Sequence, residues 1–206
     1  MKSDASLRKR DHTRQVILSA AYNLFIRQGY AATSMRQIAE RSRLALGSIY
    51  NHFPSKEHVF RAIIEERHPF LRMLPLLNAV EGDTLEQFVR NAARTLLSEL
   101  GGHPEFLNLM LVEIVEFKAR HIPVVVEKLV PRILPLADRM SSLNGGMRDI
   151  PPIIIVRAFL GMFFSFYITD FLLVRALPPE MRKANEHAVD HFADIFLHGV
   201  LLPEPA

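Results

Sequence analysis

The chain has 206 residues, of which 49% are hydrophobic, and this is enough to bury a sizeable core in one domain or two small ones. It contains no cysteine, which excludes disulfides, thiolate metal sites and cysteine nucleophiles. The net charge of +3 is unevenly distributed, because residues 1–60 contain ten Lys/Arg against four Asp/Glu and the remainder has an acidic excess. We therefore expect an anionic partner, nucleic acid or a membrane surface, for residues 1–60.

The N-terminal segment, residues 1–12, is a basic arm that need not be ordered. It has no apolar stretch behind it and so does not read as a secretory signal. The longest uncharged apolar stretch, Ala158–Thr169, is shorter than the ~18 residues of a membrane span and predicts a buried helix. We expect a cytoplasmic protein without a membrane segment.

The sequence pattern of residues 1–60 predicts short helices with tight connections. Apolar residues at helical spacing predict a helix over 14–28, ended by Gly29 as a left-handed C-cap. Ser34 or Thr33 caps a short second helix, a third covers about 46–52, and Ser55 caps a fourth. The second and third helices, joined by a turn of four or five residues, form a helix-turn-helix arrangement, which places its last helix in the DNA major groove.

The rest of the chain also predicts helices. Pro69 and Pro75 end or kink the fourth helix, and a cap at residues 83–86 begins a helix that reaches about Leu100. Further helices are expected over 104–118, 122–140, 152–177 and about 180–201, with kinks or a break at Pro131 and Pro135. No strand alternation is present, so the sequence predicts an all-α fold.

The stretch ILSAAYNLFIRQGYAATSMRQIAERSRLALGSIYNHFPSKEHVF closely resembles the N-terminal segment of TetR-type regulators. The apolar, turn and polar positions agree over about 45 residues, including Gly47-Ser48-Ile49-Tyr50 and Ser55-Lys56-Glu57. The resemblance implies a DNA-binding helix-turn-helix head over 1–60. It also implies a helical ligand-binding and dimerisation body over 61–206.

The resemblance also implies residue roles. Ser34 and Arg36 would contact phosphate and a base edge, Gly47 and Ser48 would lie closest to the groove floor, and Tyr50 and Lys56 would bind phosphates. Asn51 and His52 would contact the DNA backbone or bases. The core of the head would be Leu24, Phe25, Ile38, Ile49 and Phe53.

Three residues depart from the family pattern. Arg43 replaces the usual turn glycine, which costs about 1 kcal/mol or more if that residue is left-handed. Ala45 replaces the usual Ser/Thr cap of the recognition helix, at a cost of roughly 1 kcal/mol. Leu46, which would face the DNA, can pack on a thymine methyl but cannot donate to guanine.

Two polar clusters outside the head have ordinary explanations. His187, His191, Asp194 and His198 share one face of the last helix and predict a solvated or interfacial stripe in preference to a metal site. Glu113 and Glu116 have no base or nucleophile nearby in the sequence. We predict no enzyme site, no metal and no cofactor.

The resemblance further implies a small apolar or aromatic effector in the body and a homodimer formed through the last two helices. A pocket is expected among the aromatic and methionine residues of the body, namely Phe88, Met110, Phe117, Phe159, Met162, Phe163, Phe166 and Tyr167. A ligand-responsive repressor is the favoured interpretation. An effector-free, sequence-tolerant or nucleoid-associated DNA-binding protein is the alternative, and an enzyme with a DNA-binding head has no supporting motif.

Overall fold

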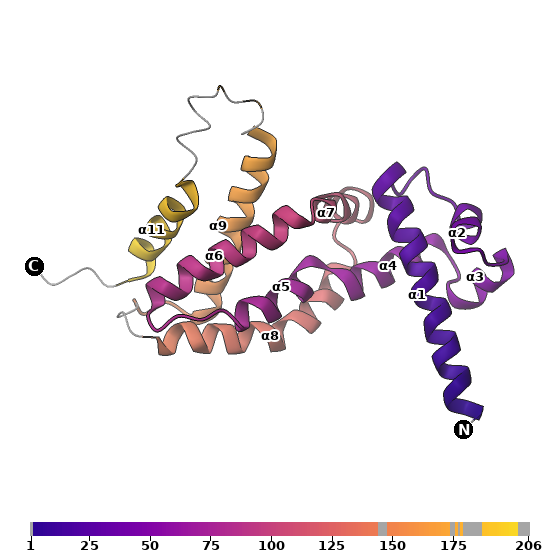
Figure 1. The fold of residues 1–206 in the computed structure, drawn as a ribbon, viewed down its shortest axis with the longest axis horizontal. Coiled ribbons are helices and arrows are strands. Elements are labelled where there is room, and N and C mark those ends of the chain that lie inside the picture. Colours follow the sequence, from indigo (N-terminus) through magenta and orange to yellow (C-terminus); the bar gives the residue numbers. More distant parts are fainter. Residues whose placement is uncertain (1, 144–147, 174–175, 177, 179–186, 202–206) are drawn as a thin grey trace, which may run out of the picture. The chain divides into compact units, whose positions relative to one another are not determined.

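The computed structural model describes residues 2–143, 148–173, 176, 178 and 187–201. These residues form helices and contain no β-strand, which confirms the predicted all-α fold (Figure 1). They divide into two compact units. The first unit comprises Met1–His68 and Glu105–Val126, and the second comprises Pro69–Pro104 and Glu127–Ala206.

The N-terminal helices of the first unit are α1 (Lys2–Gln28), α2 (Met35–Ser42), α3 (Leu46–His52) and α4 (Lys56–Arg67). Helix α1 begins at Lys2, so the N-terminal arm is helical from that residue, whereas the apolar spacing predicted a helix only from residue 14. It ends as predicted at Gly29, whose φ of 84° is left-handed and whose N–H donates to the Phe25 carbonyl at 3.0 Å.

Local caps set the starts of α2 and α4. Ser34 forms a capping box with Gln37, because the Ser34 N–H donates to Gln37 Oε1 at 2.8 Å and the Gln37 N–H donates to Ser34 Oγ at 3.2 Å. Ser55 Oγ accepts from the His58 N–H at the start of α4. These caps confirm the predicted helix starts.

Helix α7 (Glu105–Phe117) belongs to the first unit and packs against α1. Its last residue, Phe117, stacks on Phe60 of α4 with ring centroids 4.8 Å apart and meets Tyr30 edge-on at 4.9 Å. Phe60 also contacts Phe25 of α1 at 5.7 Å. An aromatic cluster of Phe25, Tyr30, Phe60 and Phe117 therefore joins α1, α4 and α7.

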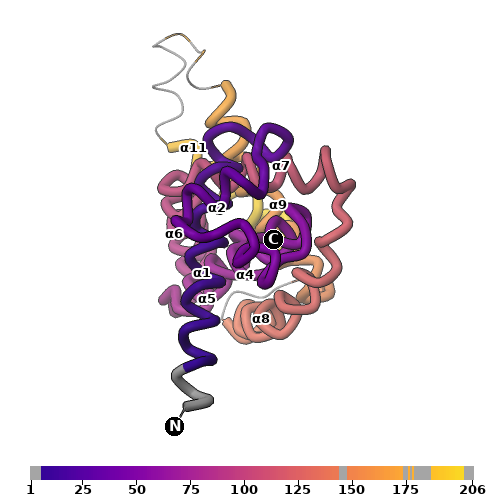
Figure 2. Tube along the Cα trace, turned by 90° about the vertical axis from the view of Figure 1, so that its right-hand side faces the viewer, coloured from indigo at the N-terminus to yellow at the C-terminus, as the bar shows by residue number. Residues whose placement is uncertain are grey.

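The second unit contains α5 (Pro69–Asn78), α6 (Leu85–Gly102), most of α8 (Ile122–Ser142), α9 (Pro152–Leu173) and α11 (Ala188–Val200). Thr84 caps α6 by accepting from the Gln87 N–H at 3.2 Å. Helix α6 lies against α9 and α11 (Figure 2), and Arg90 on α6 donates to Asp194 on α11 at 2.6 Å. The parts of the predicted helices that fall on 174–175, 177 and 180–186 lie outside the described residues.

Helix α8 continues through Pro131 and Pro135, where the sequence predicted kinks or a break. A proline inside a helix leaves the carbonyl four residues earlier without its N–H donor. Both prolines are exposed, so water can reach the carbonyls that they leave unpaired. This exposure explains why the predicted break is absent from the helix.

By length and composition, α9 is the one helix among the described residues that could cross a membrane. Its side chains Phe159 and Phe163 are buried inside the second unit, and Phe159 lies 5.6 Å from Phe196 of α11 in an edge-on ring contact. Core helices of soluble proteins satisfy the same test of length and composition, so this feature is weak support for a membrane segment.

Candidate nucleic-acid interface

The turn between α2 and α3 is short and strained at one residue. Arg43, which stands where the resembled family usually has a glycine, has φ 57° and ψ 38° and is therefore left-handed. Its N–H donates to the Glu40 carbonyl at 3.1 Å, and the Leu44 N–H donates to the Ala39 carbonyl at 3.0 Å. These bonds end α2 and hold a non-glycine residue in a conformation that costs about 1 kcal/mol or more.

Helix α3 is anchored by one face. Ile49 of α3 and Ile38 of α2 are fully buried, and Phe53, which follows α3, is almost fully buried. Leu24, which was also expected in this core, is only half-buried. The start of α3 has no side-chain cap, because Ala45 occupies the N-cap position.

The opposite face of α2 and α3 carries the residues that the resemblance assigns to DNA. Ser34, Arg36, Gly47, Tyr50 and Asn51 are exposed. Leu46, Ser48, His52 and Lys56 are partly exposed. All nine lie in the first compact unit, at the helix-turn-helix and the start of α4.

Gly47 has no role in packing the head. A Cβ atom built at this position meets no other atom within 4 Å, and its φ is not in the left-handed region. A side chain at residue 47 would therefore fit the protein by itself. The missing side chain leaves room for a partner to approach the backbone of α3 closely.

Lys56 has partners within the protein. Its Nζ donates to the Tyr30 carbonyl at 2.7 Å and lies 4.2 Å from the centre of the Tyr30 ring. Burial lowers the pKa of the Lys56 ammonium, and the Glu116 carboxylate partly opposes this effect. Lys56 therefore ties the start of α4 to the end of α1, a contact that the sequence did not indicate.

A second group of polar contacts joins α1 to the far end of α4. Arg14 forms an ion pair with Glu66, and Gln15 Nε2 donates to the same carboxylate at 2.9 Å. Arg67 donates to Ser19 Oγ at 2.8 Å. These pairs use part of the basic excess of residues 1–60 for packing within the head.

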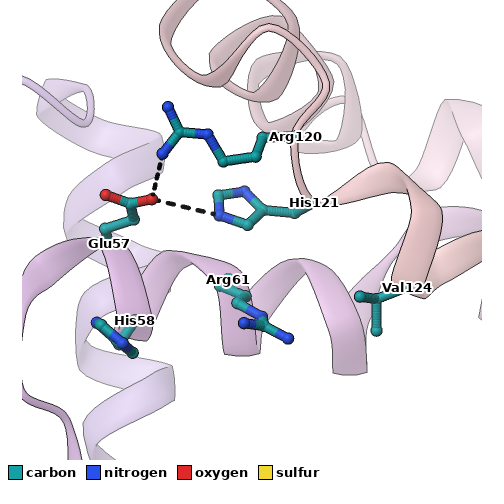
Figure 3. Close-up of a pocket in the computed structure, with 6 residues that line it drawn as sticks. All are labelled: Glu57, His58, Arg61, Arg120, His121 and Val124. Atoms are coloured by element: carbon teal, nitrogen blue, oxygen red, sulfur yellow. Dashed lines mark hydrogen bonds and ion pairs between the residues drawn. The ribbon is translucent and has the colours of Figure 1, made fainter.

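A polar pocket lies on α4 and the turn between α7 and α8, wholly within the first unit (Figure 3). Arg120 donates to Glu57 Oε1 at 2.9 Å, and His121 Nε2 lies 3.7 Å from the same oxygen. Behind them, the fully buried Glu113 accepts from the His121 backbone N–H at 2.7 Å and lies 2.9 Å from His121 Nδ1. Sequence reasoning missed this pocket, since Glu113 and His121 form no recognisable motif.

The predicted effector residues do not all fall in one unit. Phe88, Phe159, Phe163, Phe166 and Tyr167 are buried and Met162 is half-buried in the second unit. Phe117 and Met110 belong to the first unit, where Phe117 completes the aromatic cluster.

The histidine stripe of α11 is partly explained by packing. Asp194 pairs with Arg90 of α6, and the Asp194 carbonyl lies 2.7 Å from His198 Nδ1. Among the described residues no group of three or more His, Asp or Glu side chains could hold a metal ion.

Comparisons with known proteins agree with this architecture. A family described as bacterial regulatory proteins, tetR family, matches residues 17–63. The chain is 33% identical over 97 residues to the HTH-type transcriptional repressor Rv3405c of Mycobacterium tuberculosis, covering 46% of this chain and 50% of that protein. It is 27% identical over 197 residues to the uncharacterized HTH-type transcriptional regulator YvkB of Bacillus subtilis, covering 91% of this chain and 97% of that protein.

The first curated relatives are matched over half of their length or less. Among solved structures, the SmeT–triclosan complex superposes with a TM-score of 0.62 at 20% identity, covering 95% of this chain and 99% of that one. At this identity the likeness shows the fold, and it extends over both units of the chain.

Proposed function

Because this chain is a transcriptional regulator of the TetR family, we propose that it is a ligand-responsive repressor. It binds a palindromic operator in double-stranded DNA as a homodimer, and a small apolar or aromatic effector releases it. It acts in the cytoplasm, on the nucleoid. Residues 1–60 bind DNA, and the helices that follow carry the dimer interface and the effector site.

The observation that carries DNA binding is the exposed face of α2 and α3. This face lies opposite the buried Ile49 and presents Arg36, Tyr50 and Asn51 around the open backbone of Gly47. A helix of this kind enters the major groove, where a close backbone approach brings side chains to base edges. Tyr50, half of which is exposed, is placed to donate its hydroxyl to a phosphate.

The proposed role of Lys56 at phosphate is compatible with its contacts in the protein. An ammonium group has three donors, and Lys56 uses one at the Tyr30 carbonyl and a second, at 3.4 Å, at the Ala31 carbonyl. A phosphate at the start of α4 would meet the remaining donor and the positive end of the helix dipole. Lys56 would then act both in the head and at the DNA backbone.

The dimer is supported by apolar surface on α9 and α11. Six large hydrophobic side chains on these helices are exposed: Ile153, Ile154, Phe171, Leu172, Leu173 and Ile195. Exposed apolar surface favours association with another protein surface, and a two-fold axis would pair the same residues of each copy. Two heads related by this axis would read half-sites about one helical turn apart or more.

The effector site is supported by the aromatic interior of the second unit. Phe159 lies 4.8 Å from Phe163, and Phe166 lies 4.9 Å from Phe192 on α11. Small-molecule sites in helical bundles are mostly apolar and lie between helices. The fold is shared with SmeT, whose structure is a complex with triclosan. An apolar or aromatic effector is therefore proposed for this unit.

Selection of DNA from a random pool tests the proposal. The selected sequence should be palindromic, and it should bind at least ~10³-fold more tightly than unrelated DNA at the same salt concentration. Tyr50→Phe and Lys56→Ala should weaken binding to both DNAs alike, and Lys56→Ala should reduce the salt slope by about one unit. Similar affinity for selected and unrelated DNA would favour the effector-free alternative, with which the uncapped Ala45 and the apolar Leu46 agree.

A further inference from the structure

The polar pocket of the first unit has a small volume and a charged lining. It encloses about 210 Å³ and is lined by Glu57, His58, Arg61, Arg120, His121 and Val124. Pockets for drug-sized molecules enclose about 300–1,000 Å³, so this one suits a smaller molecule. It is therefore a different kind of site from the apolar effector site proposed for the second unit.

The two arginines are each oriented by one carboxylate. Arg61 Nε donates to Glu65 Oε1 at 2.6 Å, and one terminal nitrogen of Arg120 donates to Glu57 Oε1 at 2.9 Å. A guanidinium has five N–H donors, so each arginine can bind a further oxygen acceptor without giving up its present partner. Figure 3 shows both guanidinium groups bordering the same pocket, on either side of Glu57 and His121.

The histidine at the base of the pocket is fixed in position. Glu113 is fully buried and contacts both the backbone N–H and Nδ1 of His121, at 2.7 and 2.9 Å. The ring also lies 4.8 Å from Phe117 and 6.1 Å from Phe60. These contacts leave Nε2 as the ring nitrogen on the side of Glu57 and the pocket.

We propose that this pocket binds a small organic acid, whose carboxylate is held by Arg61 and Arg120 and whose apolar part lies against Val124. Guanidinium groups match carboxylates with two parallel hydrogen bonds. Arg120 already donates one hydrogen bond to a carboxylate, that of Glu57, at 2.9 Å. The ligand adds a second carboxylate beside Glu57, so the charge of Glu57 opposes its binding.

The charge of Glu57 gives the proposal a sharp test. Benzoate is the probe, and benzamide, benzylamine and inorganic phosphate are the comparison compounds. Each is titrated into the DNA-free protein by calorimetry, so the result does not depend on the proposed repressor function. We expect saturable binding of benzoate, and weaker binding of the other three by about tenfold or more.

Single substitutions then locate the site. Arg120→Gln and Arg61→Gln should each weaken benzoate binding by about tenfold or more. Glu57→Gln should strengthen it several-fold, because it removes a like charge and retains the side-chain size. Arg94→Gln is the matched control, since Arg94 is an exposed arginine of the second unit that pairs with Asp190 at 2.8 Å. It should leave benzoate binding unchanged.

Three outcomes would overturn the proposal. Equal binding of benzoate and benzamide would remove the carboxylate from recognition. Tighter binding of benzylamine, with loss in Glu57→Gln, would make the pocket a cation site. Unchanged benzoate binding in both arginine variants, each checked for native melting temperature, would place the site elsewhere.

Discussion

The head and the last two helices differ in the side chains that they expose. Within residues 6–68, the exposed large hydrophobic side chains are Leu7 and Tyr50. Helices α9 and α11 together contain fewer residues than the segment 6–68, yet they expose six large hydrophobic side chains, among them Ile153 and Ile195. Each surface matches a different partner: a polar, basic face suits phosphates and base edges, and an apolar face suits a second protein copy.

The interior of the first unit combines buried aliphatic side chains, such as Ile17 and Ile63, with the aromatic cluster. Phe60 is fully buried at its centre and contacts Phe25, Tyr30 and Phe117. Phe60→Ala should lower the free energy of unfolding by about 3–5 kcal/mol, measured by urea denaturation. Tyr50→Ala removes an exposed aromatic ring from the same unit and should cost about 1 kcal/mol or less. An equal decrease in the free energy of unfolding in the two variants would show that the aromatic cluster does not stabilise this unit more than an exposed ring does.

A charge on the apolar face should separate the proposed dimer. Ile195 is 61% exposed on α11, and Ile195→Glu would place an unpaired carboxylate in the interface. We expect the dimer dissociation constant to rise by at least about 100-fold in sedimentation, which is about 2.7 kcal/mol. Leu134→Glu on α8 is the matched control, with 51% exposure, and should leave the dimer intact. Dissociation caused only by Leu134→Glu would assign the interface to α8.

Acid should destabilise the protein through His68, the residue that follows α4. Burial lowers the pKa of His68 from its usual 6.5 to about 4, so the folded protein holds this ring neutral. The unfolded chain binds a proton below pH 6.5, and the stability contributed above that pH is lost between pH 6.5 and about 4. At pH 5 the loss should be about 2 kcal/mol relative to pH 7.

Denaturation of variants at both pH values checks this expectation. His68→Leu should remove most of the difference in stability between pH 7 and pH 5, whatever its effect at pH 7. His191→Gln, which changes an exposed histidine on α11, should retain that difference. The same acid loss in His68→Leu as in the unsubstituted protein would assign it to other groups.

The smallest expected effect concerns the start of the recognition helix. Ala45 has N-cap geometry, with φ −64° and ψ 142°, and provides no side-chain acceptor. Ala45→Ser should supply a cap and raise the free energy of unfolding by about 1 kcal/mol, measured by thermal denaturation. Ala32→Ser, which is exposed but outside a helix start, should have no such effect. A lower stability in Ala45→Ser would mean that the serine cannot reach the α3 backbone.

Local features of the sequence were sufficient to predict much of the head. Ser34, Ser55 and Gly29 determine helix ends through bonds to residues three or four positions away, so their effects are visible in the sequence. Comparison with the family pattern pointed to Arg43 as a position that could be left-handed and to the uncapped Ala45. The residues expected on the DNA-facing side of α3 also came from the family resemblance.

Contacts between distant residues could not be predicted in this way. The pairing of Phe60 with Phe117, or of Glu57 with Arg120, joins residues more than fifty positions apart and follows no periodic pattern. Glutamate is usually exposed to solvent, yet Glu113 is fully buried, because His121 provides hydrogen-bond partners for its carboxylate. The prolines of α8 were misleading for a related reason, since the exposure that makes them tolerable is a property of the folded unit.

The first compact unit is discontinuous in sequence, and this affects the order in which it can form during synthesis. Helices α1 to α4 leave the ribosome first, but Phe117 and His121 follow only after residues 69–104 have been made. At roughly 5–20 residues per second, the nascent head waits several seconds for its last helix. During that interval Phe60 and Tyr30 lack their partner on α7. The nascent N-terminal helices therefore leave aromatic surface uncovered until α7 has been made.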